Sequence, residues 1–187
     1  MLSHPPLSRA MALGLGPTAR VVDYNPEWPR LYAAEEARIL VAIGPWVSRI
    51  EHVGSTAIPG LAAKPILDIL VGLRKLDDAP RCIPRMEGLG YEYVPEYEKE
   101  LPMRRYFRKG PRENRTHHVY MVEDGRDFWV AHLRFRDFLR DHPDDARRYE
   151  LLKRELVARF ENDREAYTAS KAEFIKTMLS KAAEAGY

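Results

Sequence analysis

A six-residue run from Ile66 to Val71 is apolar at every position except Asp68. A strand that is apolar on both faces usually lies inside a sheet and is covered on both sides, so the run predicts a central strand. Burying a carboxylate without a partner is too costly. Asp68 must therefore be solvated at a strand end, pair with a cation such as Lys64 or an arginine of residues 104–115, or bind a metal. Two interpretations of Asp68 stay open: a structural carboxylate that is paired or capping, and a functional carboxylate.

The segment that leads into this strand, GSTAIPGLAAKP, is a turn rich in small residues, and it follows a predicted strand from Val47 to Val53. Gly54 permits a positive φ or a close backbone approach. Ser55 and Thr56 supply hydroxyl groups and can cap a short helical turn. Exposed backbone N–H groups at such a turn favour an anion, which suits phosphate. A plain connection between neighbouring strands is the alternative interpretation.

Lys64 lies near the end of the same segment, and we treat it as a candidate phosphate ligand together with Gly54, Ser55 and Thr56. The segment is not a Walker A loop, because Gly54-x5-Gly60-x3-Lys64 departs from the spacing GxxxxGK[ST]. The turn therefore predicts an anion site that is not a P-loop.

Hydrophobic periodicity predicts helices over residues 30–43 and 80–89, and strands over residues 91–94, 103–109 and 117–123. From residue 128 onward the period is helical. Pro143 suits the first turn of one C-terminal helix, and Asn162 with Asp163 suits the cap of the last. We predict an α+β domain over residues 20–187, with a small mixed β-sheet, helices packed to one side and a helical C-terminal third. Residues 1–19 are predicted to form a flexible N-terminal extension.

Composition narrows the class of protein. The 187 residues suit one domain, and 45% apolar with 31% charged residues is typical of a globular chain. Thirty lysines and arginines against 28 acids leave a net charge of +2, which requires neither a nucleic acid nor an acidic membrane as partner. No stretch approaches the roughly 20 apolar residues of a membrane span. Cys82 is the single cysteine, so it predicts a structural thiol and a cytoplasmic location.

A basic segment, residues 98–118, holds seven lysines and arginines and three acids. Within a strand, Arg104 and Arg105 point to opposite faces, so each face carries charge. An arginine guanidinium group can form two parallel hydrogen bonds to one phosphate, which makes Arg105 and Arg115 candidate ligand-binding residues. A solvated edge strand is an equal alternative. Basic and aromatic residues together also suit single-stranded nucleic acid, but the low net charge argues against that partner.

Two adjacent histidines, His117 and His118, open the last predicted strand. Neighbouring strand residues point to opposite faces, so the pair does not ligate one ion, and a single cysteine leaves few zinc ligands. One of the two is expected beside Asp68, where it can hydrogen-bond the carboxylate, contact a phosphate or act as a general base. We take His117 as the catalytic candidate. His52, next to the turn, is another candidate for the same cleft, with a satisfied structural histidine as its alternative.

These features resemble the nucleotidyltransferase superfamily and, more closely, the GrpB-like family of small bacterial proteins, a divergent branch of it. The resemblance covers about residues 20 to 183 and rests on HVGSTAIPGLAAKPILDILV at 52–71, NRTHH at 114–118, LRFRDFLRDHP at 133–143 and Tyr167-x3-Lys171-x2-Phe174-Ile175. It implies that the Gly-Ser pair holds the phosphates of a nucleotide and that acids of the next strand hold magnesium. It also favours a Lys171 amine that reaches the cleft.

The chain departs from the wider superfamily at the metal ligands. There, acids at i and i+2 of one strand and a third acid from a neighbouring strand hold two magnesium ions. Here Leu70 stands two residues after Asp68, and Ile66 two residues before it. One carboxylate holds Mg²⁺ weakly, although the ion keeps waters and shares substrate phosphates, so the expected cofactor is Mg²⁺ at Asp68. Candidates for the third acid, by position alone, are Glu51, Glu123 and Asp127.

Two functions fit these predictions. The first is a nucleotidyltransferase-like protein that binds a nucleotide or another phosphorylated ligand in a cleft between the Gly54-Ser55 turn and Asp68, with Mg²⁺-dependent nucleotidyl transfer as its activity if it is an enzyme. The second is a non-catalytic regulatory or helper domain that keeps only an anion pocket. The missing acid pair favours the second, as does a related actinobacterial domain that is joined to dephospho-coenzyme A kinase. A nucleic-acid binder is the weakest hypothesis.

Overall fold

The computed structural model describes residue 11, residues 21–160 and residues 164–187. Its helices are α2 (Trp28–Ile43), α3 (Ala79–Gly88), α4 (Asp127–Asp141), α5 (Pro143–Arg159) and α6 (Arg164–Glu184). Its strands are β1 (Val47–Val53), β2 (Leu67–Leu73), β3 (Tyr91–Tyr93), β4 (Arg104–Lys109) and β5 (His117–Glu123). Short 3₁₀ turns include η2 (Ser55–Ala57) and η4 (Pro95–Glu98). The extension predicted over residues 1–19, apart from residue 11, and the predicted cap at Asn162 and Asp163 lie outside the described residues.

Proline and glycine mark several element boundaries. Pro29 and Pro143 lie in the first turns of α2 and α5, where a missing N–H costs nothing. Gly44 ends α2, and its N–H donates to the Leu40 carbonyl oxygen. None of the helices in the described ranges combines the length and the apolar character that a bilayer crossing demands.

The described strands form one five-stranded sheet in the order β1-β2-β5-β4-β3. β2 and β5 pair in parallel and the other neighbours are antiparallel, so the sheet is mixed. β2 lies between β1 and β5, and each of its residues except Asp68 is buried. The α+β class with a small mixed sheet is therefore confirmed.

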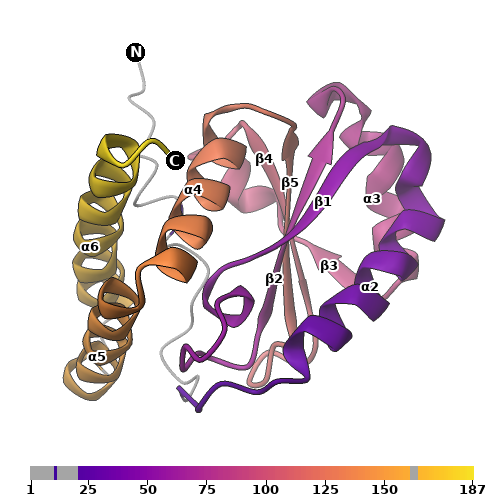
Figure 1. Cartoon of the computed structure of the whole chain (residues 1–187). Coiled ribbons are helices and arrows are strands. Elements are labelled where there is room, and N and C mark those ends of the chain that lie inside the picture. Colours follow the sequence, from indigo (N-terminus) through magenta and orange to yellow (C-terminus); the bar gives the residue numbers. More distant parts are fainter. Residues whose placement is uncertain (1–10, 12–20, 161–163) are drawn as a thin grey trace.

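Helices cover both faces of the sheet, with α2 and α3 on one face and α4 on the other (Figure 1). The expectation that the helices pack to one side was wrong. Neighbouring strand residues alternate between faces, so Ile69 packs toward α2 and α3 while Leu70 packs toward α4. A strand that is apolar on both faces needs cover on both. α5 and α6 pack against α4 and add a further helical layer on that side (Figure 1).

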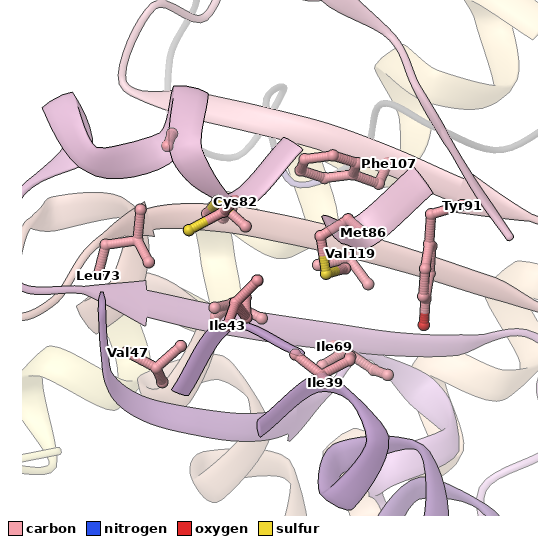
Figure 2. Packing of buried hydrophobic residues seen from close by; sticks show 13 residues of the cluster. Ile39, Ile43, Val47, Ile69, Leu73, Cys82, Met86, Tyr91, Phe107 and Val119 are labelled. Carbon is pink, nitrogen blue, oxygen red and sulfur yellow. The ribbon is translucent and has the colours of Figure 1, made fainter. Parts of the chain in front are cut away.

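The core between the sheet and α2 and α3 is built from interlocking aliphatic side chains (Figure 2). Ile39 and Ile43 of α2 meet Cys82 and Met86 of α3 above Ile69 of β2. Burial raises the pKa of the Cys82 thiol to about 11. Cys82 is thus a packing group, as the sequence predicts.

The opposite face holds the segment that carries the Gly-Ser turn. Ile58 and Leu61 of this segment pack in one apolar cluster with Phe138 of α4, Tyr149 of α5 and Ile175 of α6. The turn is therefore held between the end of β1 and the three C-terminal helices. Polar side chains from β2, β5, α5 and α6 converge beside it.

Candidate functional site

The Gly-Ser turn and Asp68 are neighbours. The antiparallel register pairs Val53 of β1 with Asp68 of β2, so the next residue, Gly54, lies against the carboxylate. Gly54 has φ 70° and ψ −170°, a region that is essentially restricted to glycine. A β-carbon at Gly54 would lie 2.9 Å from the β-carbon of Asp68, closer than real contacts allow. Glycine is required here by the backbone conformation and by the approach of Asp68.

Asp68 interacts with two side chains of β5. The parallel register pairs it with His118, whose Nδ1 lies 3.3 Å from Oδ1, and the Tyr120 hydroxyl donates to the same oxygen at 3.1 Å. Burial by itself raises the pKa of Asp68, but the hydrogen bond and charge of His118, with smaller contributions from Lys171 and Tyr120, hold that pKa below its ordinary value. The Asp68 side chain is 21% exposed. It is therefore an ionised carboxylate at neutral pH.

A cavity of about 60 Å³ lies beside Asp68. The predicted site residues that line it are Gly54, Ser55, Thr56, Lys64, Asp68 and Lys171. Its other described lining residues are Met11, Ile66, Tyr120, His132, Phe135, Tyr149, Lys153 and Ile175. One water molecule needs about 10–15 Å³ of such space, so the cavity has room for a phosphate-sized group. A whole nucleotide needs a larger pocket.

The described residues that line the cavity include three lysines and one carboxylate, an excess of positive charge. Lys64, Lys153 and Lys171 are each at most 9% exposed. Nζ of Lys153 donates to the Ala62 carbonyl oxygen at 2.5 Å. Burial lowers the pKa of Lys153 to about 7, with repulsion from Lys171 adding to the effect, and it lowers the pKa of Lys171 to about 8 against the attraction of Asp68. An anion in the cavity would stabilise both ammonium groups.

Two histidines near the cavity are neutral at pH 7, because burial lowers the pKa of His52 and of His132 to about 4. The Thr56 hydroxyl donates to the Ile66 carbonyl oxygen at 3.2 Å, so Nε2–H of His52 donates to Thr56 at 2.9 Å. His132 donates from Nδ1 to the Phe128 carbonyl oxygen at 2.8 Å. His52 thus supports the shape of the turn, and His132 adds no charge to the cavity wall.

Two arginines of α4 hold the ends of the turn. Arg136 donates to the His52 carbonyl oxygen at 2.9 Å and to the Glu51 carboxylate at 2.7 Å. Arg140 donates twice to the Ala57 carbonyl oxygen, at 3.0 and 2.8 Å. These carbonyl groups flank the turn on both sides, so the arginines fix its position relative to α4.

Replacing Arg136 with methionine is expected to lower the free energy of unfolding by about 2 kcal/mol, because the His52 carbonyl group and the Glu51 carboxylate lose a largely buried charged partner. Urea denaturation measures the change. Arg126→Met is the control, since Arg126 is 75% exposed, and its effect should stay within about 0.5 kcal/mol. Similar losses in the two variants would contradict the role given to Arg136.

The structure does not bring His117 to the cavity. Alternate residues of β5 face opposite sides of the sheet, and His117 lies on the α2 and α3 side, with its ring 6.2 Å from the ring of Tyr91. Burial lowers the pKa of His117, while the charge of Glu35 opposes this. The histidine beside Asp68 is His118. Either histidine fits the sequence pattern, because the choice depends on which face of the strand is the cleft face.

Arg105 and Arg115 also lie outside the cavity lining. Arg105 forms an ion pair with Glu98 of η4 at 3.2 Å, and Arg115 pairs with Glu92 of β3 at 2.9 Å. Acids nearby in the fold thus neutralise these two cations of the basic segment. Its strand is not an edge strand either, because β3 pairs with the outer side of β4.

Sequence reasoning did not single out Lys153 and His132 as site residues. Lys153 lies four residues after Tyr149 and three before Leu156, on the buried face of α5. A lysine at an apolar helical position is a usable signal, whereas the family resemblance is what marked Lys171. His132 lies on the buried face of α4 and carries no comparable signal.

The candidates for a third acid are paired or remote. Glu51 is bound by Arg136. Glu123 lies opposite Leu73, five positions along the strands from the Asp68 pair, which is about 17 Å. Asp127 begins α4 beyond that same end of β5. Over the described ranges, no group of three or more histidine, cysteine, aspartate or glutamate side chains is placed to hold a metal ion.

Known proteins resemble this chain in sequence and in architecture. A family model described as GrpB protein matches residues 18–181. The chain belongs to the GrpB family. The UPF0157 protein YqkA of Bacillus subtilis is 40% identical over 157 residues, which are 84% of this GrpB chain and 45% of the relative, so the chain spans less than half the length of YqkA. The crystal structure of GrpB from Enterococcus faecalis has a TM-score of 0.80 and 35% identity, and the match covers 88% of this chain and 98% of that chain.

Two further matches are more distant: one is a solved structure that shares the fold, and the other is a larger protein that shares part of the sequence. The GLD-2/RNP-8 complex has a TM-score of 0.51 at 12% identity, over 79% of the GrpB chain and 58% of that chain, a likeness of fold alone. The GrpB family that the sequence resemblance indicates is thus confirmed, and the GrpB chain shares its fold with that distant chain. The dephospho-CoA kinase of Mycolicibacterium paratuberculosis is 28% identical over an alignment of 185 positions, and the match covers 87% of this chain and 46% of the kinase.

Proposed function

We propose that this GrpB chain binds a nucleotide or another phosphorylated ligand and holds one of its phosphate groups in the cavity beside Asp68. The observation that carries the proposal is the charge of the cavity, whose described lining residues include the buried lysines Lys64, Lys153 and Lys171 together with Asp68. Burial lowers the pKa of Lys153 and of Lys171, so their charged forms are held at a cost, and a phosphate dianion supplies a counter-charge. Ser55 also lines the cavity, and its hydroxyl group can donate to the same phosphate. The rest of the ligand would extend past the lining residues.

The same residues favour binding over two-metal nucleotidyl transfer. The position two residues after Asp68 is Leu70, which is fully buried in the apolar cluster next to α4. The neighbouring strand presents His118 and Tyr120 to Asp68, and neither is an acid. We therefore propose a regulatory or helper role in which the phosphorylated ligand is bound and released unchanged. Nucleotidyl transfer is the second candidate, favoured by the fold.

Isothermal titration with ATP, a sugar phosphate and adenosine tests the proposal. We expect ATP and the sugar phosphate to bind and adenosine to bind at least tenfold more weakly, because adenosine offers no charge to the lysines. We also expect no release of pyrophosphate from ATP. Equal binding of ATP and adenosine would contradict the phosphate site, and steady pyrophosphate release would establish transfer instead. Tight binding of single-stranded RNA with a steep salt dependence would identify a nucleic-acid binder.

A further inference from the structure

The surroundings of Asp68 do not fit a magnesium ion. Mg²⁺ prefers octahedral oxygen ligands, usually one or two carboxylates together with waters and substrate phosphates. Asp68 offers one carboxylate, and its Oδ1 is already engaged by His118 and Tyr120. The same carboxylate attracts the ammonium group of Lys171. A magnesium ion at Asp68 would share this carboxylate with a competing cation.

The three lysines can supply the positive charge that a metal ion supplies at a phosphate site. They come from three separate parts of the chain, with Lys64 before β2, Lys153 on α5 and Lys171 on α6, and all three line one small cavity. The Lys153 ammonium group is anchored by the Ala62 carbonyl oxygen. Within the described part of the chain, no hydrogen bond is formed by the Lys171 ammonium group, so its three donors can be given to a ligand.

Phosphate binding by such a cluster follows from elementary electrostatics. Ammonium groups in a partly dry cavity interact with an anion more strongly than exposed ones, because water screens the charges less. Two or three lysines balance the two charges of a phosphate group, as a divalent ion would. Mg²⁺ that is bound to the phosphates of the free ligand lowers their charge and therefore weakens their attraction to the lysines.

We propose that this cavity recognises phosphate through Lys64, Lys153 and Lys171 in place of a divalent cation, so that binding needs no Mg²⁺. The inference rests on the proposed function and specifies the chemistry of its site. Asp68 is then neither a metal ligand nor a contact of the phosphate. The class of ligand that fits is a free phosphate, pyrophosphate or nucleotide anion without a bound metal.

Titration of pyrophosphate and of ATP into the full chain, once in excess EDTA and once in excess Mg²⁺, tests the inference. We expect binding in EDTA, and an affinity in Mg²⁺ that is equal or up to about tenfold lower. Binding that requires Mg²⁺ would overturn the inference and leave the proposed phosphate site in place. Absence of binding under both conditions would overturn both.

Asp68→Asn supplies a second test that does not depend on the metal content of the buffer. Asparagine keeps an oxygen that can accept from Tyr120, so the fold has a near-isosteric replacement. At about pH 6.5, where most of the lysine charge is present, we expect the affinity for pyrophosphate in EDTA to stay within about threefold of the unaltered chain. Glu173→Gln, at a position 74% exposed on α6, is the control, and its affinity shows how much the measurement varies when no cavity residue is changed. A loss of more than tenfold in Asp68→Asn alone, with the circular dichroism spectrum unchanged, would make Asp68 a ligand-binding group and overturn the inference.

Discussion

Substitution of Gly54 by alanine is expected to destabilise the chain by about 3 kcal/mol or more, because two penalties add at this position. The backbone has φ 70° and ψ −170°, which a residue with a β-carbon rarely adopts. The new methyl group would also meet the β-carbon of Asp68 at 2.9 Å. Neither strand can retreat freely, since β1 and β2 are paired along their length. Urea denaturation gives the size of the loss, and titration with pyrophosphate should show that binding is lost too.

Gly60→Ala is the matched control for Gly54→Ala. Gly60 also has a positive φ, 76°, but a β-carbon there would have nothing within 4 Å. The control therefore incurs the conformational penalty alone, and we expect about 1 kcal/mol. If the two variants lose the same stability, the contact between the turn and Asp68 is looser than described.

Replacement of Lys171 by methionine should weaken pyrophosphate binding at least tenfold and leave the fold at least as stable as before. Lys171 is buried, and this burial lowers its pKa to about 8, so its charge is held at a cost. Methionine fills a similar volume without that cost, so a gain of about 1–2 kcal/mol at pH 7 is expected. Lys176→Met, at a position 67% exposed on the same helix, is the control and should change neither quantity. Unchanged binding in Lys171→Met would contradict the role of this lysine.

The stability gain in Lys171→Met should depend on pH in a defined direction. The pKa of Lys171 is about 8 in the fold against an ordinary value of 10.5, so the unfolded chain binds more protons between these values and stability rises with pH there. The cost of the buried charge is full below pH 8 and fades toward pH 10.5. The difference between Lys171→Met and the unaltered chain should therefore shrink over this window. Asp68 and Lys153, the charged groups that act on Lys171, are present in both proteins and largely cancel in the difference.

Local sequence patterns were sufficient to predict the helices and strands and to predict that the Gly-Ser turn lies close to Asp68. The strand predicted over 117–123 has those bounds in the structure, and the central strand predicted at 66–71 is shifted by one or two residues, to Leu67–Leu73. A single polar residue in a run that is apolar on both faces had to be solvated near a strand end, paired with a cation or bound to a metal. The antiparallel pairing of the two strands that the segment connects places Gly54 beside Asp68.

Assignments that depend on which strands pair could not be made from the sequence. The choice between His117 and His118 requires knowing which face of β5 looks toward α4, and that follows only from the parallel pairing with β2. Arg115 is neutralised by Glu92, a residue of β3 that is distant in the sequence. Lys153 reaches the cavity because α5 and α6 fold back over the turn, which periodicity alone does not reveal. Long-range packing thus decided which charged residues form the site.

A crystal structure of the chain with bound pyrophosphate, grown in EDTA, tests the central claim most directly. We predict phosphate oxygens within hydrogen-bond distance of Nζ of Lys171 and Nζ of Lys153, beside the Ser55 hydroxyl group. Asp68 should still accept from Tyr120 and make no contact with a metal ion. Pyrophosphate bound elsewhere on the surface, with the three lysines unchanged around an empty cavity, would contradict the account.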